Sequence, residues 1–128
     1  MTSVNTVIGR AQRGEAMWYY LDDGVYGAYS GQIYDHAQYP LTVFSESSDR
    51  LRSVISGPTC DSIDVIAEDI QLPEMEIGDL VVGKQMGAYT LASASEFNSI
   101  PKAQVITLNG VRQEELHQDV VSIRSRAG

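Results

Sequence analysis

The sequence predicts a mainly β protein, an antiparallel, Greek-key-like β barrel or sandwich with one or two short helices. Short runs rich in Val, Ile, Tyr and Thr recur from Ser3 to roughly Gly110, and such runs are typical of strands. Gly, Asp and Pro interrupt these runs, as they do at turns. From Arg112 onward the composition favours a short helix before a basic, frayed end. Many short strands with little helix indicate a barrel or sandwich.

The first expected hairpin begins at residues 18–21, whose aromatic and aliphatic side chains favour a strand. The strand is followed by a turn in which Gly24 can take a positive φ. Residues 25–34 are expected to form the hairpin partner. Gly27 and Gly31 in this segment suit a bulge or the close approach of a ligand or another backbone.

Further strands are expected at residues 41–44, 53–55, 64–70, 80–82 and 104–108. The polar run between the first two is expected to be an exposed loop. Gly57 and Pro58 should end the strand at 53–55, and Leu72, Pro73 and Glu74 should begin a turn.

The composition is that of an ordinary globular protein. With 128 residues, of which 43% are hydrophobic and 20% charged, we expect a single domain over residues 1–128. The formal charge of −8 is spread along the chain, which disfavours a nucleic-acid partner because phosphate binding needs a basic stripe. This acidic balance fits a cationic ligand, or simply solubility.

The sequence also indicates where the protein works. No apolar run approaches the roughly 18 residues that a membrane span requires, and the first residues lack the pattern of a secretory signal. We therefore expect a cytoplasmic location and no membrane partner. The single cysteine, Cys60, cannot form an internal disulfide, which fits a reducing compartment or a thiol kept for reactivity.

Two segments combine residue types that suit a binding site. Asp35 lies between two ring side chains, Tyr34 and His36, and such a carboxylate can bind a cationic amine; alternatively it caps the following turn. Cys60 and Asp61 follow a Gly-Pro turn that presents them on a loop. A cysteine in that place is either a reagent or a small buried hydrophobe.

Tyr89 follows two small residues that would let a ligand approach the backbone, and its hydroxyl can donate to a phosphate oxygen. The alternative is an aromatic residue of the core. Histidine and cysteine show no metal-ligand spacing, so no metal is expected. No Gly-rich phosphate loop or dinucleotide fingerprint appears. Neither lysine, Lys84 or Lys102, has a context that suggests a Schiff base.

Six strings resemble, in order and spacing, the C-terminal half of eukaryotic-type ornithine decarboxylase. They are YYLDDGVYG at 19–27, YDHA at 34–37, GPTCDSID at 57–64, LPEM at 72–75, MGAYT at 86–90 and FN at 97–98. The chain is thus similar to the C-terminal β domain of the pyridoxal-phosphate-dependent ornithine, lysine, arginine and diaminopimelate decarboxylases, whose barrel domain has the alanine-racemase-like fold. The diaminopimelate and arginine enzymes generally carry Glu where Asp61 stands, so the resemblance favours ornithine or lysine as substrate.

The resemblance implies a site that this chain shares with another chain. In the family, pyridoxal 5'-phosphate is bound as a Schiff base to a lysine of an N-terminal α/β barrel, which is expected to be absent here. The β domain closes that site across a head-to-tail dimer. The chain is therefore expected to act as a decarboxylase only with a barrel-bearing chain, as part of a homo- or hetero-oligomer in polyamine biosynthesis, and to be inert alone.

The resemblance also implies roles for individual residues. Tyr89 would hydrogen-bond the cofactor phosphate. Asp35, with Tyr34 beside it, and Asp61 would bind the distal ammonium of a basic amino acid or its diamine product. Two carboxylates around an ammonium would reject substrates with an apolar end. Phe97 would line the substrate pocket.

Three further roles follow from the same resemblance. Cys60 would be the acid that protonates the α-carbon after decarboxylation, within the partner subunit's site. Tyr26 and Asp64 would contact the partner at the dimer interface. Because these dimer residues are present, a second hypothesis is a non-catalytic decoy or interaction module that binds a decarboxylase or its regulator.

Overall fold

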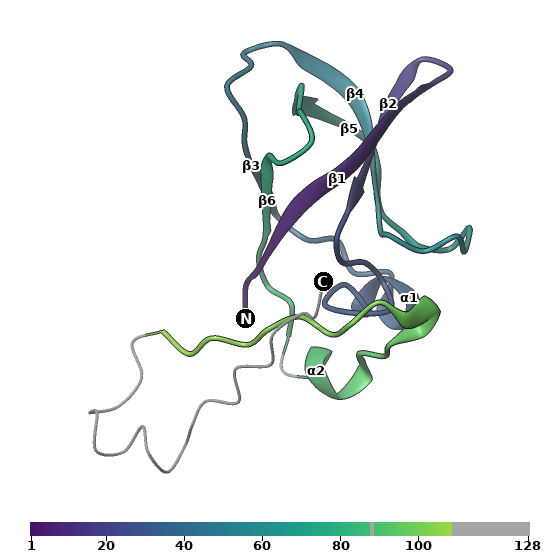
Figure 1. The fold of residues 1–128 in the computed structure, drawn as a ribbon, viewed down its shortest axis with the longest axis vertical. Helices are drawn as coiled ribbons and strands as arrows, with labels where there is room; N and C mark the ends of the chain where they lie inside the picture. Colours follow the sequence, from purple (N-terminus) through teal and green to yellow (C-terminus); the bar gives the residue numbers. More distant parts are fainter. Residues whose placement is uncertain (88, 109–128) are drawn as a thin grey trace.

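The computed structural model describes residues 1–87 and 89–108, and its main element is one curled, six-stranded sheet. The strands follow the order β3-β6-β1-β2-β4-β5 across the sheet. Their bounds are β1 (Ser3–Arg13), β2 (Ala16–Leu21), β3 (Leu41–Phe44), β4 (Arg50–Ser56), β5 (Val65–Pro73) and β6 (Leu80–Gly83). Figure 1 shows the sheet as an open half barrel, with the short helices at its lower end. The predicted mainly β fold is confirmed.

In the part of the chain that the structure describes, three short helices lie outside the sheet: α1 (Gly31–Asp35), α2 (Thr90–Ser93) and the 3-10 helix η1 (Phe97–Ser99). A hydrogen bond of 2.7 Å between the hydroxyls of Ser30 and Ser93 joins the start of α1 to the end of α2. The backbone N–H of Ser95 donates to the carbonyl of Tyr26 at 2.7 Å. These bonds hold the two helices against the turn that follows β2.

Four of the five strand pairings are antiparallel, as predicted, but β2 pairs with β4 in parallel. The strand β1 is central and pairs with β2 on one side and β6 on the other. Parallel neighbours need a long crossover connection, and here the crossover carries α1 and β3. The sheet is therefore mixed rather than purely antiparallel.

Aromatic and aliphatic side chains from several strands and the turn after β2 form the core. Its buried members are Val7, Tyr19, Leu21, Val25, Tyr29, Ile55, Ile66, Leu72, Met75, Val81 and Met86. Buried tyrosines keep their hydroxyls hydrogen-bonded. The Tyr19 hydroxyl accepts from the Met75 N–H at 3.1 Å, and the Tyr29 hydroxyl donates to Asn5 Oδ1 at 2.6 Å.

The expected hairpin partner at residues 25–34 is wrong, because this segment forms turns and then α1. The physical reason is Asp23, whose carboxylate accepts hydrogen bonds from the N–H groups of Gly24 (2.9 Å) and Ala28 (3.2 Å). Such local bonds compete with a strand ladder. Gly27 is needed for this turn, because a Cβ there would collide with the Asp23 carboxylate.

Most of the other expected strands are found. Those at 41–44, 53–55, 64–70 and 80–82 correspond to β3, β4, β5 and β6, and β4 ends before Gly57 as expected. The turn expected from Leu72 is displaced, because β5 continues to Pro73. Residues 104–108 are not a strand. The helix expected from Arg112 lies outside the described residues.

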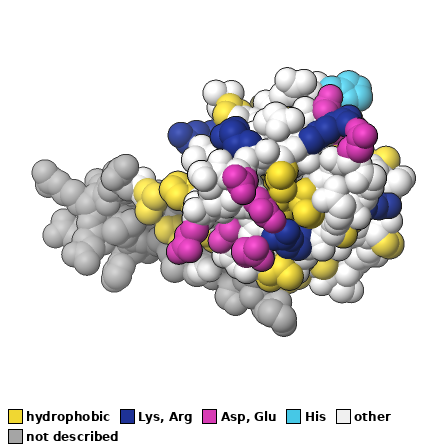
Figure 2. All heavy atoms as spheres, turned by 90° about the horizontal axis from the view of Figure 1, so that it is seen from above, with side chains coloured by type: hydrophobic (Ala, Val, Ile, Leu, Met, Phe, Trp, Pro, Cys, Tyr) yellow, Lys and Arg dark blue, Asp and Glu magenta, His cyan; other side chains and the backbone are white. Residues whose placement is uncertain are grey.

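Charged side chains of both signs mix on the surface. Figure 2 shows acidic side chains beside basic ones on the face seen from above. Arg10 pairs with Glu74 at 2.9 Å and Glu76 at 3.0 Å, and Arg52 pairs with Asp69 at 2.6 Å. In the part of the chain that the structure describes, no helix is long and apolar enough to cross a membrane.

Candidate active-site segments

The residues with predicted chemical roles lie on connections at one end of the half barrel, not on the strands. The turn after β2 supplies Tyr26, the loop between β4 and β5 supplies Cys60 and Asp61, and η1 supplies Phe97. Figure 1 shows the helices at the lower end of the sheet, with the β4–β5 connection above them at the right. A rigid sheet that positions variable loops is a common way to build a binding site.

Asp61 is held by two hydrogen bonds. Its Oδ2 accepts a short hydrogen bond from the hydroxyl of Tyr26, and its Oδ1 accepts from the N–H of Ile63 at 3.1 Å. The Tyr26 hydrogen bond lowers the pKa of Asp61, with a further contribution from Ile63. The same hydrogen bond raises the pKa of Tyr26 to about 12. Asp61 is therefore an oriented carboxylate that stays ionised at neutral pH.

Phe97 packs on the tyrosine that orients Asp61. The rings of Tyr26 and Phe97 are stacked, with centroids 4.3 Å apart and planes 25° apart. Phe97 remains 40% exposed, so part of its ring is available to a ligand. This stack connects η1 to the Asp61 loop through Tyr26.

Cys60 is exposed, and it contacts a residue to which the sequence motifs assigned no role. The side-chain amide of Asn98 donates to Cys60 Sγ, with the nitrogen 3.3 Å from the sulfur. Asn98 has left-handed backbone angles, with φ 57 and ψ 25. Asparagine is one of the few residues that adopt this conformation readily. Asn98 belongs to the FN string at 97–98, so the sequence resemblance already included this residue without giving it a role.

Asp64 is buried inside the domain, and its predicted role at the dimer interface stays a prediction. Its side chain is fully buried, with a relative exposure of 0%. It accepts hydrogen bonds from the N–H of Val25 (3.0 Å) and from the N–H (3.0 Å) and hydroxyl (2.6 Å) of Thr59. Gly24 and Gly57 make room for it, since a Cβ on either would collide with the carboxylate. Asp64 therefore braces the loop from within.

The remaining predicted site residues stand apart from the Asp61 cluster. Tyr34 and Asp35 end α1, not a strand as expected, and both are exposed. Tyr89 precedes α2 and is 83% exposed, which excludes the alternative that it is a core residue. Among residues 1–87 and 89–108, no hydrogen bond joins these three side chains to Cys60 or Asp61. The chain therefore presents two separate sets of site residues.

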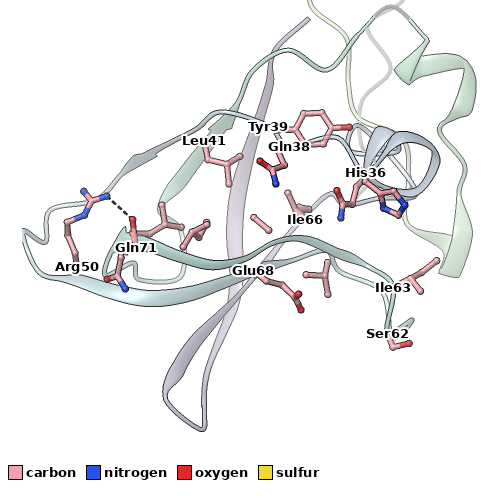
Figure 3. Close-up of a pocket in the computed structure, with 15 residues that line it drawn as sticks. His36, Gln38, Tyr39, Leu41, Arg50, Ser62, Ile63, Ile66, Glu68 and Gln71 are labelled. Atoms are coloured by element: carbon pink, nitrogen blue, oxygen red, sulfur yellow. Dashed lines mark hydrogen bonds between the residues drawn. The ribbon is translucent and has the colours of Figure 1, made fainter.

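An open groove of about 710 Å³ separates the two edge strands of the half barrel. Figure 3 shows residues 36–41 on one wall and β5 on the other. His36, which follows Asp35, and Ile63, close to Asp61, lie at the same end of this groove. The groove thus runs up to both predicted substrate-binding segments. The sequence did not indicate it, because it is made by the curl of the sheet.

The family comparison agrees with this arrangement of a sheet and functional loops. Residues 1–87 match the family described as the C-terminal sheet domain of pyridoxal-dependent decarboxylases. This chain belongs to that family. The resemblance that the sequence strings predicted is therefore confirmed, and it extends to the solved structures described next.

Two curated decarboxylases resemble the chain in sequence. The lysine/ornithine decarboxylase of Selenomonas ruminantium is 47% identical over 103 residues, which are 80% of this chain and 26% of the relative. The chloroplastic ornithine decarboxylase of Nicotiana glutinosa is 39% identical over 116 residues, covering 83% of this chain and 27% of the relative. The chain spans about a quarter of the length of these relatives.

A solved structure resembles the chain in three dimensions. The lysine/ornithine decarboxylase of Vibrio vulnificus, complexed with cadaverine, is 55% identical with a TM-score of 0.81. The match covers 85% of this chain and 30% of that one. A further relative, antizyme inhibitor 2 of Xenopus laevis, is 40% identical over 97 residues, which cover 73% of this chain and 21% of the relative.

The described residues fit a limited role toward the family's cofactor. Tyr89 has an exposed hydroxyl that can donate to a phosphate oxygen. Lys84 is exposed, not desolvated as a Schiff-base lysine would be, and Lys102 lines a different, mostly apolar groove. Within residues 1–87 and 89–108, no group of three or more His, Cys, Asp and Glu side chains could hold a metal ion.

Proposed function

We propose that this chain is the C-terminal domain or small subunit of a pyridoxal-phosphate-dependent ornithine or lysine decarboxylase in diamine and polyamine biosynthesis. It completes an active site at a dimer interface together with a barrel-bearing chain, in the cytoplasm. The observation that carries this proposal is the cluster in which Asp61, held by Tyr26, stands next to the exposed Cys60.

Asp61 binds the distal ammonium group of the substrate. The Tyr26 hydrogen bond orients its carboxylate and favours its ionised form, so an ammonium gains a charge-assisted partner without reorganising the loop. Asp35 supplies a second carboxylate, with Tyr34 beside it, and Phe97 covers the methylene chain. Two related structures, described as complexes with cadaverine and putrescine, support a diamine as the product.

Cys60 gives its proton to the α-carbon after carbon dioxide leaves. The S–H bond breaks, its electron pair stays on sulfur as a thiolate, and a C–H bond forms at the α-carbon; water then returns a proton to the sulfur. Pyridoxal phosphate, when bound, supplies the electron sink for loss of carbon dioxide. Tyr89 holds its phosphate through the exposed hydroxyl.

The separation of the two sets of site residues favours a shared site. Tyr34 and Asp35 lie on α1, whereas Cys60 and Asp61 lie on the loop after β4, and no hydrogen bond joins the sets in the described chain. In a head-to-tail dimer, one copy contributes the first set and the other copy contributes the second. Tyr26 lies at this interface, where its hydroxyl also orients Asp61.

A non-catalytic interaction module is the second candidate, and one comparison favours it. A relative with 40% identity over 97 residues is named as an inhibitor of antizyme rather than as a decarboxylase. A sheet domain similar to this one therefore also occurs in a protein that is named as a regulator and not as an enzyme. In that case Cys60 and Asp61 have no role in turnover.

The deciding experiment mixes this chain with a barrel-bearing chain, the Selenomonas ruminantium decarboxylase from which its own sheet domain has been removed. Release of labelled carbon dioxide from ornithine and lysine is measured with pyridoxal phosphate present. Turnover that requires both chains supports the proposal. No release, while the intact Selenomonas enzyme is active under the same conditions, contradicts it.

The control is the double variant Cys60→Ala with Asp61→Ala in the same mixture. Association of the two chains is followed by size-exclusion chromatography with light scattering. Lost turnover with unchanged association supports catalysis, whereas association without any turnover in either form supports the interaction module.

A further inference from the structure

We infer that Asn98 is a positioning residue that aims the Cys60 thiol and stabilises its sulfur as the proton leaves. This inference rests on the proposed function, in which Cys60 is the proton donor. The observation is the contact of 3.3 Å between the Asn98 side-chain nitrogen and Cys60 Sγ. The two residues are 38 positions apart in sequence and meet only through the fold.

The backbone at Asn98 explains how a surface amide reaches the sulfur. Asn98 and Ser99 both have positive φ, at 57 and 60. The N–H of Ser99 donates to the carbonyl of Glu96 at 2.9 Å, and the N–H of Ile100 donates to the carbonyl of Phe97 at 3.2 Å. These bonds close a tight turn, and the left-handed residue at its centre projects its side chain back toward the loop after β4.

The Phe97 stack fixes this turn against the Cys60 loop. Phe97 packs on Tyr26, and Tyr26 is bonded to Asp61. Adjacent residues of η1 thus contact adjacent residues of the loop, Phe97 through Tyr26 to Asp61, and Asn98 directly to Cys60. Two parallel links between the same segments restrict the position of the thiol more than either link alone.

The chemistry gives the amide a role that grows during proton transfer. Neutral sulfur is a weak acceptor, so the Asn98 hydrogen bond is weak before the reaction. As the proton leaves, sulfur gains negative charge, and a hydrogen bond to a charged acceptor is stronger. The amide therefore stabilises the transition state more than the resting thiol, which is the condition for a contribution to rate.

Three substitutions at one position separate this role from a structural one. Asn98→Gly keeps the left-handed backbone and removes the amide. Asn98→Asp keeps the shape but replaces the donor with a carboxylate that repels the developing thiolate. Asn98→Ala removes the amide and strains the backbone. Ser99→Gly is the matched control, because it relaxes the neighbouring positive φ without touching the sulfur.

The first readout needs no cofactor and no partner. NMR couplings between the Hα and Hβ protons of Cys60 are measured in the 128-residue chain. One large and one small coupling are expected in the native chain and in Ser99→Gly, and nearly equal, averaged couplings in Asn98→Gly and Asn98→Asp. Unchanged couplings in both amide variants overturn the inference, because the thiol is then not oriented by Asn98.

The second readout uses the active mixture of chains in heavy water and measures turnover and the stereochemistry of the deuterium in the product. Loss of a hydrogen bond of ordinary net strength is expected to lower turnover by roughly two- to tenfold in Asn98→Gly, with a larger loss in Asn98→Asp. The stereochemical purity of deuterium at the product α-carbon should fall in both. A wild-type rate and purity in Asn98→Gly overturn the inference. If the native mixture is inactive, the proposed function fails, while the couplings still decide whether Asn98 orients the thiol.

Discussion

The hydroxyl of Tyr26 donates a hydrogen bond to Oδ2 of Asp61, and the Tyr26 ring stacks on Phe97. Tyr26→Phe keeps the stack and removes the hydrogen bond. Because this bond is the largest cause of the lowered Asp61 pKa, the variant should raise that pKa toward the ordinary value of 3.8. A carboxyl ¹³C NMR titration of Asp61 measures the change.

Tyr20→Phe is the matched control for this titration. The Tyr20 hydroxyl interacts with Arg13 at 3.5 Å on the surface of β2 and does not contact Asp61. The Asp61 titration should be the same in this variant as in the native chain. If Tyr26→Phe likewise leaves the titration midpoint of Asp61 unchanged, the hydrogen bond does not set the Asp61 pKa.

The buried carboxylate of Asp64 leads to a stability prediction. Asp64→Asn replaces one accepting oxygen with an NH₂ group that faces either the Val25 N–H or the two donors of Thr59. The free energy of unfolding of the variant should be lower by about 2 to 4 kcal/mol, because hydrogen bonds to a charged group are lost and a donor faces donors. Urea unfolding followed by circular dichroism measures the difference.

The exposed Asp69 provides the comparison for Asp64. Asp69 pairs with Arg52 at 2.6 Å, and both side chains are at least half exposed. Surface ion pairs contribute roughly 0 to 1 kcal/mol, so Asp69→Asn should change stability by less than about 1 kcal/mol. Equal losses in the two variants would contradict the bracing role of Asp64.

The sequence predicted the strands well where local signals agreed with the fold. Gly57 and Pro58 end β4 as expected, since a Gly-Pro pair stops a strand whatever packs around it. At residues 25–34 the β-forming Val and Tyr side chains favoured a strand, but the Asp23 hydrogen bonds to Gly24 and Ala28 prevail. The outcome depends on where the Asp23 side chain points, and the β propensities of the individual residues carry no information about that.

The sequence motifs named candidate site residues but could not give their contacts. Tyr26 lies 35 positions from Asp61, and Asn98 lies 38 positions from Cys60. The resemblance placed Asp64 at the dimer interface but gave no indication that its side chain is buried within the domain. Its burial depends on the space beside Gly24 and Gly57, which only the folded chain reveals. The catalytic and binding roles stay predictions.

The buried pair of Tyr19 and Met75 gives a further stability prediction. Tyr19→Phe removes the acceptor of the Met75 N–H, which lies in the core. An unsatisfied buried donor should lower the free energy of unfolding by about 1 to 3 kcal/mol. Thermal or urea unfolding tests this, with Tyr20→Phe as the control that should change stability by less than about 0.5 kcal/mol. A neutral Tyr19→Phe would mean that water or another group satisfies the N–H.

The Tyr26–Asp61 pair should also make stability depend on pH at both extremes. Folding lowers the Asp61 pKa, so the pair stabilises the fold above the ordinary carboxyl pKa of 3.8, and this contribution is lost as pH falls through the lower folded value. Folding raises the Tyr26 pKa to about 12, so the contribution is present below 10.0 and is lost as pH rises from there toward 12. Urea unfolding across these two windows, in the native chain and in Tyr26→Phe, measures both effects. The variant should show a smaller loss of stability in each window, and identical pH profiles for the two proteins would contradict the linkage.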